Sequence, residues 1–197
     1  MLRSIKRFKE FDKVTEFRLW NSLFIAFGME LLVPIIISLK GLYMATWIIS
    51  AFMIANTLAV KANNYIVNKY SLDSMYKMGI FIHLGFILIS SIYFFNPVIM
   101  IWLDSTLAII ETALFSSYSI ALNNYLTDNY PNDMKDFQIV RNSSWADSSM
   151  LGALLITGLT AISLGVGVIS FIVYNTIFSL WLMKNWNFYK DIEYIKE

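Results

Sequence analysis

Cysteine is absent from this chain of 197 residues, and charged side chains are scarce. The missing thiols exclude disulfides, thiolate nucleophiles and thiolate-ligated metals. Charged residues make up 15% of the chain, against about 25% in an ordinary soluble domain. This scarcity, with 57% hydrophobic residues, excludes a disordered chain, a nucleic-acid-binding arm and a disulfide-stabilised secreted scaffold. The apolar excess indicates that lipid is the solvent, and we expect no nucleic-acid partner.

Six apolar stretches approach or reach the length of about 20 residues that a helix needs to cross the hydrocarbon core of a bilayer. They cover roughly 20–39, 42–60, 78–95, 97–122, 144–163 and 165–183. A count of five would require dropping the fifth stretch, whose first turns are rich in serine. The sequence therefore predicts an all-α polytopic membrane protein, with one six-helix domain over residues 19–184.

The positions of lysine and arginine predict the orientation, because these residues concentrate on the cytoplasmic side of a membrane. All 15 except Lys40 fall in the N-terminal segment, at Lys61 directly after the second stretch, in two polar connections at about 62–77 and 123–143, or from residue 184 onward. Lys40 belongs to the expected turn between the first two spans. Both termini should therefore be cytoplasmic, with 185–197 as a tail, in a bacterial inner membrane or a plasma membrane.

The short external turns are expected at Asn96-Pro97 and at Ser163-Leu164-Gly165, which carry no charge. Residues 1–18 form a separate basic segment, in which Leu2, Ile5, Phe8, Phe11 and Val14 recur at helical spacing. We expect an amphipathic helix lying on the cytoplasmic interface. No small-residue cleavage site follows the first apolar run, so a cleaved signal peptide is not expected.

Ionisable side chains inside the predicted spans cost at least about 2.5 kcal/mol each on insertion scales, and so indicate function. Glu30 lies mid-way along the first span, four residues before Pro34, whose missing amide frees a carbonyl. Asp104 and Glu111 lie seven residues apart on one face of the fourth span. Asp147 lies in the fifth span. We expect these four acids to bind a substrate or an ion. The alternatives are a place near the outer interface for Asp104 and structural hydrogen bonds or ion pairs for the others.

Uncharged polar and small residues give weaker signals. Candidates for lining a polar cavity are Ser105, Thr112, Ser116 and Asn175. Residues at spacings of four that predict close helix packing are Ser144, Ser148 and Gly152. The only histidine, His83, is expected to be a neutral packing residue.

Enzymatic motifs are missing as well. The chain has no Gly-x-Ser-x-Gly elbow, no His-Glu-x-x-His and no phosphate-cradling glycine loop. A single histidine cannot build a multi-histidine metal site, and His83 has no partner motif for an intramembrane serine protease. We therefore expect neither catalysis nor a cofactor.

Six spans with both ends cytoplasmic, and a basic second-to-third connection, resemble one half of a major facilitator superfamily transporter. The family's loop signature, Gly-x-x-x-Asp-Arg-x-Gly-Arg-Arg, falls at 64–73. Asn64, Asn68, Lys69 and Ser71 stand at its first glycine, aspartate, arginine and second glycine, so only the basic position is kept.

The resemblance has implications for fold and assembly. Each half in that family consists of two inverted three-helix repeats, whose first and fourth helices line the substrate cavity. It therefore places Glu30 and Glu111 at the cavity. Because a complete carrier has two halves, it also implies a parallel homodimer or a partner half on another chain.

Helix five looks somewhat like the ferroportin branch of that family, through Arg141-Asn142-Ser143-Ser144 and Asp147, with Phe171-Ile172 and Asn175 further on. In that branch, acids on helices one and five serve a divalent-metal site. The resemblance makes Glu30 and Asp147 their counterparts.

The sequence thus predicts a half-size secondary transporter that dimerises and works by alternating access. It would carry a small cationic or metal-ion substrate or couple to protons. One alternative is a non-transport membrane protein of this fold, such as an interaction, immunity or exclusion factor. Another is a six-helix binding subunit of a larger transporter. The expected partners are the lipid bilayer, the second half and a small solute or ion.

Overall fold

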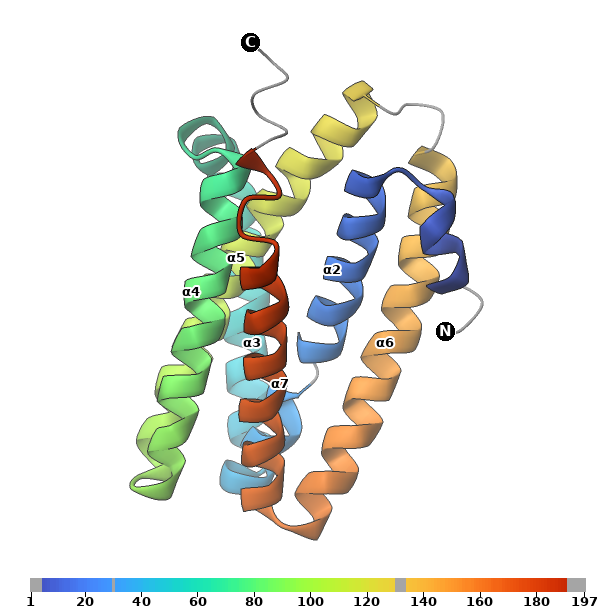
Figure 1. The fold of residues 1–197 in the computed structure, drawn as a ribbon. Helices are drawn as coiled ribbons and strands as arrows, with labels where there is room; N and C mark the ends of the chain where they lie inside the picture. The colour runs from blue at the N-terminus through green and yellow to red at the C-terminus, as the bar shows by residue number, and fades with distance from the viewer. Residues whose placement is uncertain (1–4, 30, 130–133, 191–197) are drawn as a thin grey trace. The chain divides into compact units, whose positions relative to one another are not determined.

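Helices make up all the regular secondary structure in the computed structural model, which describes residues 5–29, 31–129 and 134–190 (Figure 1). Within those ranges, the description leaves out the side chains of residues 29, 40–45, 52, 55, 56, 59, 60, 62 and 64. The prediction of an all-helical chain is confirmed.

The elements follow one another along the chain with short breaks. They are η1 (Arg7–Glu10), α2 (Lys13–Met29), α3 (Leu32–Lys69), α4 (Leu72–Ser90), η2 (Ser91–Phe94), α5 (Pro97–Asn129), α6 (Met134–Ile162) and α7 (Leu164–Lys184).

Five helical segments among the described residues are long and apolar enough to cross a membrane. They are Lys13–Leu39, Leu72–Phe94, Pro97–Asn129, Met134–Ile162 and Leu164–Lys184. The serine-rich fifth stretch of the sequence is among them, within α6. The expected second span, 42–60, lies in α3 and includes side chains outside the described residues. Large apolar side chains remain on the outside, such as Leu88 at 73% and Leu154 at 64% exposure, as expected of helices that face lipid.

The chain folds into two compact units, each built from segments far apart in sequence. Unit 1 comprises Met1–Ser38 and Asn124–Phe171, and unit 2 comprises Leu39–Asn123 and Ile172–Glu197. Unit 1 holds α2 and α6, whereas unit 2 holds α4, most of α3 and α5, and the larger part of α7.

The backbone of α3 is helical through Lys40 and Gly41, where the sequence predicts a turn between two spans. A single glycine costs a helix only about 1 kcal/mol relative to alanine, so strong helix formers on both sides outweigh it. The break falls earlier, since α2 ends at Met29 and α3 begins at Leu32. The change from unit 1 to unit 2 does occur beside Lys40, at Ser38 and Leu39.

The N-terminal segment is helical at Ile5 and Lys6 and continues as the 3-10 turn η1, and residues 1–4 lie outside the described residues. It breaks after Glu10, and α2 already begins at Lys13, inside the segment 1–18 that the sequence predicts to be separate. Asp12 causes the new start, because its carboxylate accepts hydrogen bonds from the Val14 and Thr15 amides, at 2.8 and 3.2 Å. Phe8 is fully buried and its ring meets Trp20, so this segment packs on α2.

The polar connections are much shorter than the sequence suggests. Only Tyr70 and Ser71 separate α3 from α4, in place of a loop over 62–77. Likewise, α5 extends to Asn129 and α6 starts at Met134, within the loop expected over 123–143. A helix satisfies its own backbone groups, so it continues beyond the apolar stretch when its side chains become polar.

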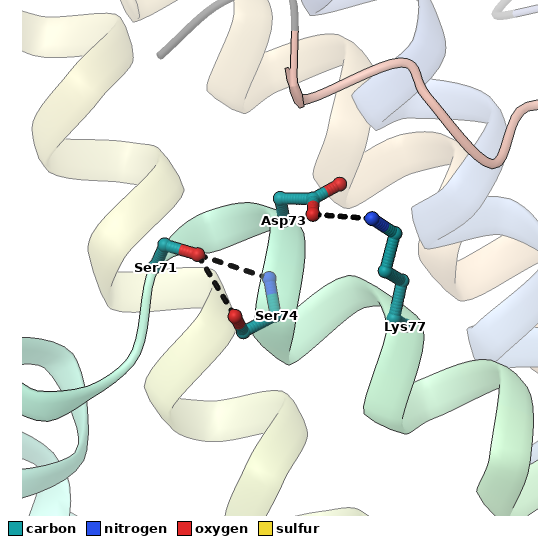
Figure 2. Close-up of polar contacts among 4 residues, drawn as sticks. All are labelled: Ser71, Asp73, Ser74 and Lys77. Carbon is teal, nitrogen blue, oxygen red and sulfur yellow. Dashed lines mark hydrogen bonds and ion pairs between the residues drawn. The ribbon is translucent and has the colours of Figure 1, made fainter.

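The turn before α4 falls inside the weakened loop signature and is stabilised locally (Figure 2). The hydroxyl of Ser71 accepts a hydrogen bond from the Ser74 amide at 3.1 Å, which caps α4. One turn on, Lys77 and Asp73 form an ion pair at 2.5 Å. Lys69, the basic position of the signature, hydrogen-bonds the Tyr65 hydroxyl at 3.0 Å. This bond raises the pKa of Lys69 above its ordinary value, and Tyr70 adds to the effect.

Candidate ion-binding site

Three helices of unit 2 bring an acid, an imidazole and an amide together. His83 of α4 lies with its Nε2 3.3 Å from Oε1 of Glu111 on α5. Its other ring nitrogen, Nδ1, lies 2.9 Å from Oδ1 of Asn175 on α7. The His83 side chain is 8% exposed and that of Glu111 is 24% exposed, inside segments apolar enough to cross a membrane. This chain of contacts is the candidate site.

The contact between His83 and Glu111 is attractive when the two side chains share one proton. The Asn175 Oδ1 atom is a carbonyl oxygen and only accepts, so Nδ1 of His83 donates to it. A neutral imidazole then has a bare Nε2, which faces the Glu111 carboxylate. Two acceptors do not attract each other without a proton between them. The pair is therefore either an imidazolium with a carboxylate or a neutral imidazole with a carboxylic acid.

Aromatic groups of α7 cover this pair. The Phe178 ring lies 4.5 Å from the His83 ring, centroid to centroid, in an edge contact. Tyr174, one position before Asn175, interacts electrostatically with Glu111. The site is thus a polar group enclosed by apolar and aromatic side chains, where charge is costly unless paired.

A second buried acid lies two turns from Glu111 on the same helix. Asp104 is completely buried, and its Oδ2 accepts a hydrogen bond from Ser90 of α4 at 2.8 Å. The other carboxylate oxygen, Oδ1, has no hydrogen-bond partner in the described part of the chain. Ser105 beside it is buried too, and its hydroxyl likewise lacks a described partner. The Asp104 side chain is therefore covered by protein, and its place near the outer interface stays a prediction.

Three tyrosines, Tyr76, Tyr118 and Tyr189, lie together on the side of Glu111 away from Asp104 along α4 and α5. The hydroxyls of Tyr118 on α5 and Tyr189 lie 2.5 Å apart, and both residues are buried. Tyr76 of α4 donates to the Leu182 carbonyl oxygen at 2.8 Å and makes an edge contact with the Tyr189 ring. These contacts attach the turn after α7 to α4 and α5.

The four residues predicted to line a polar cavity do not all lie at the site. Asn175 joins the site, and Ser105 lies beside Asp104. Thr112 instead donates to the Ala108 carbonyl of its own helix, and Ser116 is half-buried. Glu30 lies outside the described residues, so its predicted role stays a prediction.

The remaining predicted residues belong to unit 1, where α2 and α6 lie side by side (Figure 1). Ser144, Ser148 and Gly152 are all buried on α6. The Ser148 hydroxyl donates to the Leu23 carbonyl at 2.8 Å, and a Cβ at Gly152 would lie 2.5 Å from the Phe27 carbonyl oxygen. The two helices therefore approach closely at Ser148 and Gly152. Asp147 is half-buried on the same helix.

Sequence reasoning assigned His83 to packing and so missed the link between Glu111 and Asn175. A signal was available, because His83 lies midway between Tyr76 and Ser90 at steps of seven residues. It also missed a contact between α3 and α5, where the Ser117 hydroxyl donates to Asn63 Oδ1 at 2.6 Å. Both are buried, but no regular spacing singles out Asn63.

No protein family, curated protein or solved structure matches the chain. The described residues hold no group of three or more acids, histidines or cysteines that would ligate a metal.

Proposed function

We propose that this protein is a half-size secondary transporter of the membrane, in which the His83–Glu111–Asn175 site couples the movement of a small solute to protons. The main support is the pairing of His83 with Glu111 inside helices that are long and apolar enough to cross a membrane. Ionisable groups at that depth are costly, and chains of acids and histidines there mark proton relays.

The contacts of His83 and Glu111 favour a proton over a metal ion as the coupling species. Nδ1 is used by Asn175, so His83 offers only Nε2 to a ligand, and Glu111 already occupies that side. A proton fits between the two atoms without rearrangement. A divalent metal would need further donors arranged around it.

Helix directions within each unit support a chain that crosses the membrane repeatedly. In unit 1, Leu23 meets Ser148 and Phe27 approaches Gly152, so α2 and α6 run parallel. In unit 2, His83 meets both Glu111 and Asn175, while Ser90 meets Asp104 and Tyr76 meets Leu182. Hence α4 runs antiparallel to α5 and α7. These directions are those of a succession of alternating spans, as in one half of a major facilitator transporter.

A second half is part of the proposal, in the form of a parallel homodimer. Native mass spectrometry of the protein released from nanodiscs measures this directly. We expect twice the mass of one chain, and a monomer would remove the paired-half arrangement while leaving the site intact.

Transport is tested with proteoliposomes that contain a pH-sensitive dye. Organic and inorganic cations (choline, ethidium and Mn²⁺) are added outside in turn, and the lumenal pH is recorded. We expect at least one of them to change lumenal pH with wild type, and Glu111→Gln to abolish the change. Asp128→Asn, an exposed acid of the same helix, is the matched control and should behave as wild type.

If no cation changes lumenal pH, the transport proposal fails and the non-transport alternative takes its place. A response that is equal in wild type and Glu111→Gln removes Glu111 from the coupling site.

The single histidine makes a spectroscopic check simple. Labelling with ¹⁵N-histidine reports on His83 alone, since no other histidine is present. We expect Nδ1 to carry a proton throughout and the Nε2 signal to change between wild type and Glu111→Gln. An Nδ1 without a proton would contradict the hydrogen-bond assignment.

A further inference from the structure

Polar pairs recur at regular intervals between α4 and α5. Ser90 meets Asp104 and His83 meets Glu111, and each partner is seven residues further along its own helix. One more step of seven reaches Tyr76 and Tyr118, which both make edge contacts with the Tyr189 ring. Neighbouring rungs are thus about 10 Å apart along the helix axis. We call these three pairs the outer, middle and inner rungs.

On α7, Asn175 joins the middle rung and the Leu182 carbonyl, seven residues on, accepts from Tyr76 of the inner rung. Tyr189, in the turn after α7, completes the inner rung. A spacing of seven keeps side chains on one seam when helices pack at a small crossing angle. The three rungs therefore form one polar line of about 21 Å, most of the thickness of a bilayer core of about 30 Å.

Every rung contains a group that both gives and takes a proton. The outer rung has a carboxyl group and the middle rung an imidazole with a carboxyl group. The inner rung has phenol hydroxyls, which release their own proton when they receive another. Water that enters when a layer opens carries the proton between rungs, and each transfer breaks one O–H or N–H bond for each one formed.

Apolar layers interrupt the line between rungs. Between the outer and middle rungs, Leu107 closes onto Gly85, where a Cβ would lie 2.9 Å from Leu107 Cδ2. Between the middle and inner rungs lie Ile80 of α4, Leu114 of α5 and Phe178 of α7, all buried. These layers separate the rungs by more than hydrogen-bond distance, so the proton of the middle rung does not pass to a neighbouring rung while both layers are closed.

Other titratable groups near the line are few in the described part of the chain. On α7, Tyr174 interacts electrostatically with Glu111. On α4, Lys77 is paired with Asp73 beyond the inner rung. The α3 helix packs on α5 through Asn63, and its Lys61, Tyr65 and Lys69 are exposed. The middle rung therefore exchanges its proton chiefly along the line.

We infer that the α4–α5–α7 seam is a gated proton path. Asp104 exchanges protons with one side, the tyrosine rung exchanges them with the other, and the middle rung holds the proton while both apolar layers are closed. This inference rests on the proposed function for its purpose, but the path itself is measurable without any transported solute. The unpartnered Oδ1 of buried Asp104 is the position at which a water delivers or receives a proton.

The test opens the layers and measures proton leak. Proteoliposomes with lumenal pyranine receive a potassium diffusion potential through valinomycin, with no solute added. We expect Leu107→Ala with Phe178→Ala to raise the flux about tenfold over wild type, equivalent to a barrier lower by about 1.4 kcal/mol. The matched control pair is Leu103→Ala with Ile177→Ala on the same helices, where the side chains are 41% and 56% exposed. Their flux should equal that of wild type.

Substitutions of the rung residues then test whether the proton leak follows the proposed path. In the leaky background, Asp104→Asn, Glu111→Gln and Tyr118→Phe should each return the flux close to wild type. A leak that persists in Glu111→Gln overturns the path, and no leak in a folded double variant overturns the gate. Size-exclusion chromatography shows whether the variants are folded. If they are not, the milder pair Leu107→Val and Phe178→Leu is used with the same criteria.

The two proposals fail separately. A rung-dependent leak with no solute-linked pH change supports the path and rejects the carrier. A solute-linked pH change that needs Glu111, without any leak in the opened variants, supports the carrier and rejects the path.

Discussion

The two units pair their helices by opposite means. In unit 1, α2 and α6 run parallel and touch through small residues and backbone atoms, with Gly152 against the Phe27 carbonyl and Ser148 bonded to the Leu23 carbonyl. In unit 2, α4 runs antiparallel to α5 and α7, and long side chains such as His83 and Glu111 meet across the seam.

This difference indicates which helix seam has a structural role and which has a functional role. Backbone contacts between small residues fix a helix pair but carry no titratable group, so such a seam has one state. A seam of acids, imidazole and phenols changes its charge with each proton, so its packing energy depends on protonation. We therefore assign the structural role to the α2–α6 seam and the functional role to the α4–α5–α7 seam.

The largest effect is expected from removing half of the middle rung. His83→Leu leaves the Glu111 carboxylate without its partner, and we expect a loss of about 3 kcal/mol, at the low end for broken buried pairs because Glu111 keeps some exposure. The double variant His83→Leu/Glu111→Leu should recover most of that loss. Reversible unfolding in mixed micelles measures both, and equal losses in the single and double variants would contradict a coupled pair.

A methyl group at Gly152 tests the opposite seam. The Cβ of Gly152→Ala would overlap the Phe27 carbonyl oxygen, so we expect a loss of about 2 kcal/mol from overpacking. Gly158→Ala on the same helix meets nothing within 4 Å and serves as the control. It should be neutral or slightly stabilising, since alanine is the better helix former. Equal melting temperatures for the two variants would show that α2 does not approach α6 this closely.

The start of α2 is expected to contribute less. Asp12→Ala removes the acceptor for the Val14 and Thr15 amides, and loss of such a cap costs about 1 kcal/mol. Asp12→Asn should retain nearly all the stability, because asparagine caps equally well. Thermal unfolding compares the two, and a loss in Asp12→Asn as large as in the alanine variant would indicate a charge effect in place of a cap.

The smallest effect concerns one hydrogen bond of the α2–α6 seam. Ser148→Ala loses the bond to Leu23, and such bonds between membrane helices average about 0.6 kcal/mol. Ser144→Ala, which loses only a bond within α6 to the Arg141 carbonyl, should change stability less. Chemical unfolding in mixed micelles measures this difference, and its reversal would contradict the hydrogen bond from Ser148 to the Leu23 carbonyl.

Much of the fold follows from local sequence signals. The turn at Asn96 is an example, since its side chain accepts from the Val98 and Ile99 amides just before α5, and proline follows it at the first helical position. Ser163 does the same for Val166 before α7. Such caps involve residues only two or three positions apart, which is why the sequence indicates them.

Hydropathy did not predict the first helix break, between Met29 and Leu32, or the short lengths of the polar connections. Hydropathy locates apolar stretches, but a helix ends where its backbone groups find other partners, as at Asp12 and Ser71. Both residues are good caps by type. A charge followed by glycine at Lys40–Gly41 is typical of a turn, but the helix α3 continues through both residues.

The sequence by itself determined a chain for a lipid environment, with buried acids on the α5 stretch and small residues on α6, because composition and spacing along one helix are local properties. Only the tertiary structure decided that Glu111 meets His83 and that His83 meets Asn175. Those contacts join residues up to 92 positions apart. Which helix faces which is set by the packing of whole surfaces, and no single helix carries that information.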